Sequence, residues 1–191
     1  MVAMLKAGRG LELRPLLLKD ARALFQLVEA NRNRLRRWLP WVDDTHSQSD
    51  TRAYLLRIRA LAGQGLASPH GLWWRDRLVG AVAFNWIDRA NGSAGIGYWL
   101  AQEAEGHGLM TAAVAALLRH GFHTLKLNRI EIHAAVRNRR SRAIPQRLGF
   151  RHEGTLHQAE FLCGHFVDHA VYGLLAADWQ RLCNLAKAGR P

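Results

Sequence analysis

A glycine-containing turn between a strand pattern and a long amphipathic segment constrains the fold of this chain more than any other feature. The turn is Gly106-His107-Gly108, which follows the alternating stretch 96–100 and opens the segment 106–123. Apolar residues recur at helical spacing in that segment, at Met110, Val114, Leu117, Leu118 and Phe122. A strand that passes through such a turn into a helix predicts an α/β fold, in which backbone N–H groups and the helix dipole can hold phosphate oxygens.

Further strands and helices are predicted on both sides of this unit. Period-two alternation and turn residues predict strands over residues 11–14, 71–75, 78–87, 94–100, 129–136, 150–156 and 166–175. Helices are predicted from a cap at Asp20, over a short segment that ends at Pro40, over residues 49–63, and over residues 139–148. This order predicts a single α/β domain over residues 1–191 with a mixed sheet, a core of about residues 11–179, and frayed ends at residues 1–10 and 186–191.

The charge of the chain limits its partners. Its 191 residues include 27 Lys and Arg against 15 Asp and Glu, which gives a formal net charge of +12. Such a field attracts a phosphorylated cofactor, an acidic protein or a nucleic acid, and it disfavours cationic substrates such as polyamines. The sequence has neither a run of about 18 apolar residues nor an apolar leader, so we expect a cytoplasmic protein without a membrane span.

Taken alone, the glycine turn fits a plain strand-to-helix connection as well as a phosphate site. Gly-Lys-Ser/Thr does not follow it, which disfavours a nucleotide triphosphatase loop, and Thr111 stands where a dinucleotide-binding turn has its third glycine. A series of four motifs is more specific: Tyr98-Trp99-Leu100, residues 106–111, Asn138-x-x-Ser141, and Leu148-Gly149-Phe150-x-x-Glu153-Gly154. In this order and spacing the chain resembles the GNAT acetyltransferases.

Three further stretches resemble the RimJ/RimL ribosomal-protein N-acetyltransferases within that family: Leu35-x-x-Trp38-Leu39-Pro40-Trp41, Gln158-Ala159-Glu160-Phe161 and Asp168-x-x-x-Tyr172. The resemblance implies a mostly antiparallel sheet with helices on both faces, acetyl-coenzyme A as the donor, and a homodimer. It implies the following donor-binding residues: Trp99, Leu100, Gly106, His107, Gly108, Leu109, Met110, Thr111, Asn138 and Ser141. The family has Gln or Arg where this chain has Glu103, so we expect Glu103 to point away and backbone N–H groups to bind the pyrophosphate.

Acetyl transfer to an amine requires that the amine lose a proton and that the leaving thiolate gain one. Presenting a neutral amine at pH 7 costs roughly 1 kcal/mol for an α-amino group and about 5 kcal/mol for lysine. The resemblance implies Ser141 as the acid, whereas a serine in a first helical turn is otherwise a capping group. Glu160 is the predicted base or water-positioning carboxylate, with Glu131 and Glu153 as alternatives. Asn138 is expected to cap the helix and to contact pantetheine.

Trp38, Trp41 and Tyr98 are the predicted acceptor-binding residues, although the two tryptophans also suit the packing of a short helix. If they line an acceptor groove, the neighbouring arginines meet acidic groups of the acceptor: Arg34, Arg36 and Arg37. Pro145 lies inside the predicted helix 139–148 and removes the hydrogen bond to the Ser141 carbonyl, which predicts a kink or widening there. The histidines and cysteines show no metal-ligand spacing, so no metal is expected.

The leading functional hypothesis is direct acetyl transfer, in a ternary complex, to the N-terminal α-amino group of an acidic ribosomal protein. A small-molecule amine or an amino acid is an alternative acceptor. A GNAT-fold protein that binds acyl-CoA without transferring it is another alternative. A basic nucleic-acid-binding module would explain the charge and the aromatic residues, but it leaves the ordered motifs unexplained, so nucleic acid is not expected as a substrate.

Overall fold

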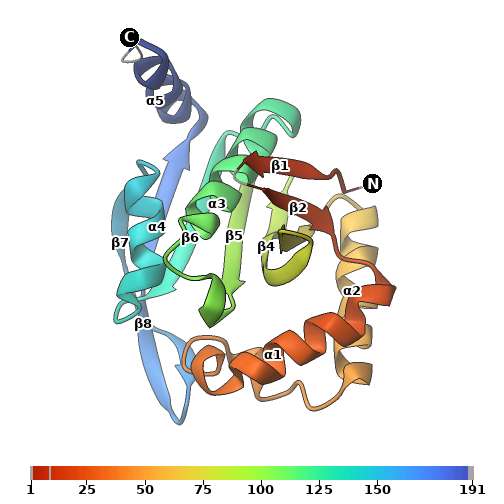
Figure 1. The fold of residues 1–191 in the computed structure, drawn as a ribbon. Coiled ribbons are helices and arrows are strands. Elements are labelled where there is room, and N and C mark those ends of the chain that lie inside the picture. The colour runs from red at the N-terminus through yellow and green to blue at the C-terminus, as the bar shows by residue number, and fades with distance from the viewer. Residues whose placement is uncertain (1, 9, 189–191) are drawn as a thin grey trace.

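The computed structural model describes residues 2–8 and 10–188 and is built around an eight-stranded sheet in the order β1-β2-β3-β4-β5-β6-β8-β7 (Figure 1). Its strands are β1 (Leu5–Gly8), β2 (Leu11–Pro15), β3 (Ser68–Trp74), β4 (Arg77–Asp88), β5 (Ser93–Leu100), β6 (Arg129–Ala135), β7 (Arg151–Leu162) and β8 (His165–Leu175). All neighbours in this sheet are antiparallel except β5 and β6, which are parallel. The predicted mixed, mostly antiparallel sheet is therefore confirmed.

Helices cover both faces of the sheet, as predicted. They are α1 (Ala21–Leu35), α2 (Gln48–Gly63), α3 (Leu109–Arg119), α4 (Arg139–Arg147) and α5 (Ala176–Ala188). Successive side chains of a strand point to opposite faces. On β5, Tyr98 packs against the cluster that includes α3, whereas Trp99 packs against the buried residues of α1 and α2. The two helical layers therefore lie on opposite sides of β5 (Figure 1).

The apolar stripe of α3 forms the centre of the core. Val114 and Leu117 are completely buried and share one cluster with Phe84 of β4 and Ile130 of β6. The helix ends earlier than predicted, at Arg119, and residues His120–Thr124 form a π-helical turn. Gly121 explains the close packing of this turn, because an added Cβ would lie only 2.8 Å from the side chains of Ile130 and Phe84.

Both ends of the chain are more ordered than the sequence indicated. Residues 5–8 form β1, which pairs with β2, so the expectation of a frayed start is wrong for this stretch. At the other end, α5 continues through Ala188, and Trp179 stacks on Phe122 with ring centroids 6.0 Å apart. The remainder of the predicted frayed tail, residues 189–191, lies outside the described residues.

Three predicted helix boundaries also differ. The short helix expected to end at Pro40 is absent, because α1 continues to Leu35 and Pro40 instead begins a 3-10 helix, Pro40–Val42. Proline fits this first helical position, where its missing N–H is not needed. Asp20 does not cap α1 but accepts the Leu17 N–H at 2.8 Å. Helix α2 is capped by Ser47, which accepts the backbone N–H of Asp50.

Pro145 does not widen α4, so that prediction is wrong. The helix is α-helical without interruption from Arg139 to Arg147, with Pro145 inside it. Pro145 lies close to the end of this short helix, where Leu148 still donates its N–H to the Ile144 carbonyl at 3.2 Å. The Ser141 carbonyl, which a non-proline residue at 145 would bond, accepts the Tyr98 hydroxyl instead, at 3.0 Å.

We predict that Pro145→Ala stabilises the protein by up to about 3 kcal/mol, because alanine restores the helical N–H and removes the crowding by the proline ring. Urea-induced unfolding measures the change. Arg147→Ala, an exposed substitution in the last turn of the same helix, is the control and is expected to stay within about 0.5 kcal/mol of wild type. An unchanged or lower free energy of unfolding for Pro145→Ala would contradict this account.

A second prediction concerns the buried His70 ring on β3. Its Nδ1 lies 3.1 Å from the Ser68 carbonyl and its Nε2 lies 2.9 Å from the Ala3 carbonyl, at the start of the chain. Burial lowers the pKa of His70, so below pH of about 6.5 the unfolded chain takes up a proton before the folded one does. The contribution of His70 to the free energy of unfolding is therefore fully present above that pH. It declines as the pH falls toward the folded pKa, by at most about 1.4 kcal/mol per pH unit.

Urea unfolding between neutral and mildly acidic pH tests this. His70→Gln should flatten the decline, whereas the exposed His165→Gln should keep the wild-type pH dependence. If the free energy of unfolding falls with pH as steeply in His70→Gln as in wild type, His70 is not the cause of the decline.

Candidate functional site

The two parallel strands at the centre of the sheet separate soon after they meet. Strands β5 and β6 pair through Ser93, Ala94 and Gly95 on β5, and no pairing between the described strands follows, although β5 continues to Leu100. Beyond this point the N–H and C=O groups of the two strands that face the gap do not pair with each other. They can therefore form hydrogen bonds with an extended ligand that lies between the strands. The result is a wedge-shaped opening in the middle of the sheet.

A bulge in β4 accompanies this separation. The register between β4 and β5 shifts between Phe84 and Trp86, opposite the glycines of β5. A Cβ on Gly97 would lie 2.3 Å from the Asn85 amide nitrogen, and one on Gly95 would lie 2.3 Å from the Trp86 ring. A side chain at either place would have to displace these two β4 side chains, which occupy the space above the glycines.

The predicted phosphate-binding turn lies directly after β5. Gly106 and Gly108 have φ of +81° and +72°, and Gly108 is the residue before α3. No side chain caps this helix start within the described residues, so the first-turn N–H groups at Leu109 and beyond remain available to an anion.

Glu105 fixes the turn to two helices. Its carboxylate accepts Arg34 of α1 and Arg140 of α4, each at 2.5 Å. Arg34 also donates to the Leu100 carbonyl at the end of β5. This cluster could not be predicted from the sequence, because its three elements are separated along the chain.

The structure brings Asn138, Ser141 and Tyr98 together. The Asn138 side chain accepts the Ser141 N–H at 3.1 Å, which is the predicted helix cap. The Ser141 hydroxyl donates to the Tyr98 oxygen at 3.3 Å, and Tyr98 donates to the Ser141 carbonyl. Burial raises the pKa of Tyr98, so this phenol stays neutral. Tyr98, predicted as an acceptor-binding residue, thus shares a hydrogen-bonded pair with the predicted acid.

Helix α4 is held in place by Tyr172, whose role the sequence did not reveal. The buried Tyr172 hydroxyl accepts Arg142 Nε at 2.9 Å, and Arg142 also donates to the Val136 carbonyl at 2.9 Å. This contact fixes the first turn of α4, and with it Ser141. The stretch Asp168-x-x-x-Tyr172 was the signal that could have indicated it.

Glu160, the predicted base, lies on β7 near the tip of the β7–β8 hairpin. Its carboxylate is 3.1 Å from Nε2 of His169 on β8. The tip reaches the end of α1, where the Cys163 thiol lies 3.5 Å from the Arg36 carbonyl. No hydrogen bond in the described part of the chain joins Glu160 to Ser141.

The two alternative carboxylates are engaged elsewhere. Glu131 accepts Arg129 at 2.7 Å and lies 2.9 Å from His133. Glu153 accepts the same Arg129 at 2.9 Å, and this contact lowers the pKa of Glu153. Both carboxylates therefore belong to one ion-pair network on β6 and β7.

The predicted acceptor-binding tryptophans, Trp38 and Trp41, lie in the segment that follows α1. Trp41 is partly exposed, with its ring 6.3 Å from that of Trp99, and Trp38 is half-buried. Two of the three arginines expected to meet the acceptor are already paired within the protein. Arg34 binds Glu105, and Arg36 binds Asp43 at 3.0 Å. Of these three arginines, this leaves the exposed Arg37 to meet an acceptor.

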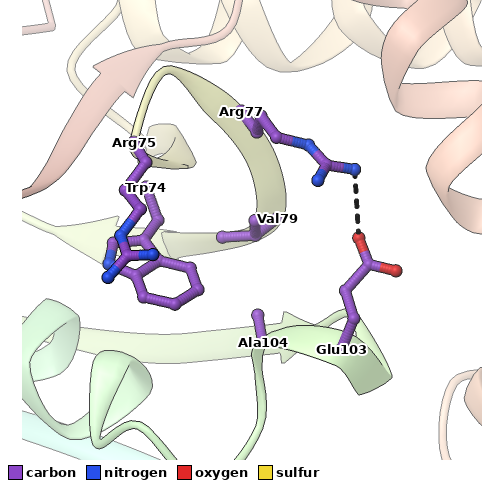
Figure 2. Close-up of a pocket in the computed structure, with 6 residues that line it drawn as sticks. All are labelled: Trp74, Arg75, Arg77, Val79, Glu103 and Ala104. Carbon is purple, nitrogen blue, oxygen red and sulfur yellow. Dashed lines mark ion pairs between the residues drawn. The ribbon is translucent and has the colours of Figure 1, made fainter.

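A hollow of about 310 Å³ adjoins the glycine turn (Figure 2). Its wall includes Trp74, whose ring lies 4.9 Å from His107 and beneath the guanidinium of Arg75. Glu103, where the family pattern has Gln or Arg, reaches across to Arg77 at 3.7 Å. Its carboxylate is thus directed to the β3–β4 turn.

The residues that the structure describes were also compared with the requirements of a metal site and of a membrane-spanning helix. No group of three or more His, Cys, Asp or Glu side chains there is arranged to hold a metal ion. None of the helices in that part of the chain is long and apolar enough to cross a membrane.

Comparison with known proteins agrees with this geometry. The acetyltransferase (GNAT) domain model matches residues 10–151. A putative ribosomal N-acetyltransferase of Bacillus subtilis, YdaF, is 35% identical over 178 residues, which are 92% of this chain and 96% of that one. The ribosomal-protein-serine acetyltransferase of Escherichia coli is 33% identical over 172 residues, 90% of this chain and 96% of its own.

A solved structure gives the same result. RimL, a ribosomal L7/L12 α-N-protein acetyltransferase in complex with coenzyme A, matches with a TM-score of 0.89 at 31% identity and covers 93% of this chain and 99% of that one. The divergent β5 and β6, the glycine turn before α3 and these matches lead to one conclusion: the chain belongs to the GNAT family of acetyl-CoA-dependent N-acetyltransferases.

Proposed function

We propose that this enzyme acetylates the N-terminal α-amino group of a protein, by direct attack on acetyl-CoA in a ternary complex, and that an acidic ribosomal protein is its acceptor. The observation that carries the proposal is the opening between β5 and β6, with the glycine turn and Ser141 on its α3–α4 side and Trp99 and Trp41 on its α1 side. A donor and an acceptor can therefore meet from opposite faces of the sheet.

The donor side of this opening fits coenzyme A. The positive-φ glycines Gly106 and Gly108 let the backbone approach a pyrophosphate, which the first-turn N–H groups of residues 109–111 then bind. The unpaired edge of β5 at Trp99 and Leu100 can pair with the amide groups of pantetheine. Acetyl-CoA supplies a thioester whose carbonyl carbon accepts the amine.

Ser141 is the proposed proton donor to the leaving sulfur. Its position depends on the Asn138 cap and on the Arg142–Tyr172 contact, which together fix the first turn of α4. The hydroxyl already donates a hydrogen bond to neutral Tyr98, and rotation about its Cα–Cβ bond can redirect that proton to the sulfur.

The acceptor side supports an acidic protein. The net charge of +12 and the exposed Arg37 beside Trp41 favour anionic partners over cationic amines. Two relatives are named for ribosomal acetylation, and the solved relative is named for α-N-acetylation of L7/L12. An α-amino group also costs less to deprotonate than lysine does. A cytoplasmic homodimer, which the RimJ/RimL resemblance implies, completes the proposal.

Mass spectrometry tests the acceptor. Purified ribosomal proteins and synthetic peptides with free or blocked N-termini are incubated with the enzyme and acetyl-CoA. We expect a mass gain of one acetyl group on the α-amino group of acidic N-termini and none on blocked peptides. Acetylation of lysine side chains, or of small amines alone, would replace this proposal by another acceptor class.

We predict that Glu160→Gln lowers kcat by about 100-fold, because the amide cannot take the proton of the amine, and such groups contribute roughly 10²–10⁴-fold. The dissociation constant for acetyl-CoA should change by less than about two-fold, since the proposal assigns donor binding to the glycine turn and β5 and not to Glu160. Steady-state kinetics and calorimetry measure the two quantities. The parallel variant Glu131→Gln should keep its turnover, and the reverse pattern would move the base to Glu131.

A further inference from the structure

We propose that His169 is a positioning residue for Glu160. Its ring holds one oxygen of the carboxylate, so that the other oxygen is directed to the amine of the acceptor. This inference rests on the proposed function, in which Glu160 takes the proton of that amine. In the stretch Asp168-x-x-x-Tyr172, His169 is one of the three unspecified residues, so the motif assigned it no role.

The register of the β7–β8 hairpin creates the pair. Leu156 lies opposite His169 and Glu160 lies opposite Val167, so three residues of β7 face the single residue Asp168 between these positions. Val167 and His169 are two apart on β8 and share one face. Glu160 is thereby a diagonal neighbour of His169, at hydrogen-bond distance. Without the bulge, alternation would place this carboxylate in another register.

Asp168 holds the bulge in shape. It accepts the Gln158 N–H at 2.9 Å and lies 3.1 Å from His157 Nδ1. These bonds lower the pKa of Asp168, so it stays ionised. Gln158 has a φ of +50°, a backbone conformation that a residue other than glycine adopts at a cost. Strained backbone is common at functional sites, and here it places the Glu160 carboxylate next to the His169 ring.

The His169–Glu160 pair is shielded from water. The side chains of His169 and Glu160 are 17% and 29% exposed, whereas those of the nearby His157–Asp168 pair are 83% and 40% exposed. Shielding strengthens the hydrogen bond relative to one at the open surface. The residues opposite His169 on the two neighbouring strands are uncharged, and so are the residues two positions before and after it on β8. They are Leu156, Ala135, Val167 and Val171. Glu160 is therefore the charged group that the ring contacts in this patch.

The chemistry follows from the two oxygens of the carboxylate. With a proton on Nε2, the ring donates to Oε2 of Glu160, which leaves Oε1 to accept a proton. The amine nitrogen forms a bond to the acetyl carbon as the carbon–sulfur bond breaks. The sulfur keeps the electron pair and takes a proton from Ser141, and the proton lost by the nitrogen goes to Oε1. Glu160 then releases its proton to solvent and Ser141 regains one from solvent, so both groups return to their starting state. His169 gains and loses no bond in this step.

Kinetics of three variants test the role. His169→Leu should lower kcat about ten-fold, in the range for residues that orient a functional group, with the KM for acetyl-CoA unchanged. His169→Gln, whose amide can still donate to Glu160, should recover most of that loss. His133→Leu is the matched control, because His133 also pairs with a glutamate on the same sheet, and it should keep wild-type kcat.

A double-mutant cycle separates positioning from a general structural effect. In the Glu160→Gln background, His169→Leu should lower kcat by less than about two-fold further, because the group it positions is gone. Independent, multiplying losses would overturn the positioning role. Loss in Glu160→Gln without loss in His169→Leu would overturn it while leaving the proposed base intact. Full activity in Glu160→Gln would overturn the base and the positioning role together.

A measurement without any acceptor keeps the inference testable if no peptide is acetylated. Nitrogen-15 NMR of the histidine rings should show a changed His169 signal in Glu160→Ala and an unchanged His133 signal. A His169 signal that does not respond to the loss of Glu160 would show that the pair is absent, and it would overturn the inference whatever the substrate.

Discussion

The separation of β5 from β6 is the constraint on which the rest of this structure depends. Two parallel strands that stopped pairing without compensation would leave polar backbone groups unsatisfied. In this protein the strands stop pairing at one place, and specific contacts stabilise the structure around it. The β4 bulge fills the space beside Gly95 and Gly97, and the glycine turn follows the free end of β5. Tyr172 anchors α4 to β8, and Tyr98 of β5 donates a hydrogen bond across the gap to the Ser141 carbonyl of α4.

Much of the fold could be predicted from the sequence because its elements follow local rules. The alternation in β4 and β5 and the helical stripe of α3 each place apolar residues on one buried face. The observed bounds of the two strands lie close to the predicted ones, whereas α3 is shorter than predicted. Strand β1 was missed because four residues are too few for a pattern, and its pairing with β2 is visible only in three dimensions. A proline by itself does not tell where a helix ends: Pro40 begins a 3-10 helix, and Pro145 lies inside α4.

The candidate site divides in the same way. The Asn138 cap and the turn conformation at Gly108 follow from residue type at a local position, and the structure has both. The contacts of Glu105, Tyr172 and His169 could not be predicted, because each joins residues that only the register or the layer packing brings together. Charge composition likewise gave the sign of the surface but could not say that Arg34 and Arg36 are internally paired.

Glu105 joins three parts of the molecule that surround the opening between β5 and β6. One carboxylate bridges α1, which leads into the tryptophan segment, and α4, which carries Ser141, and it does so from the residue that precedes the glycine turn. Widening the gap between these walls must therefore either break an ion pair or move all three elements as one mechanical unit. Through this one carboxylate, a movement of α1 or of α4 is passed to the glycine turn.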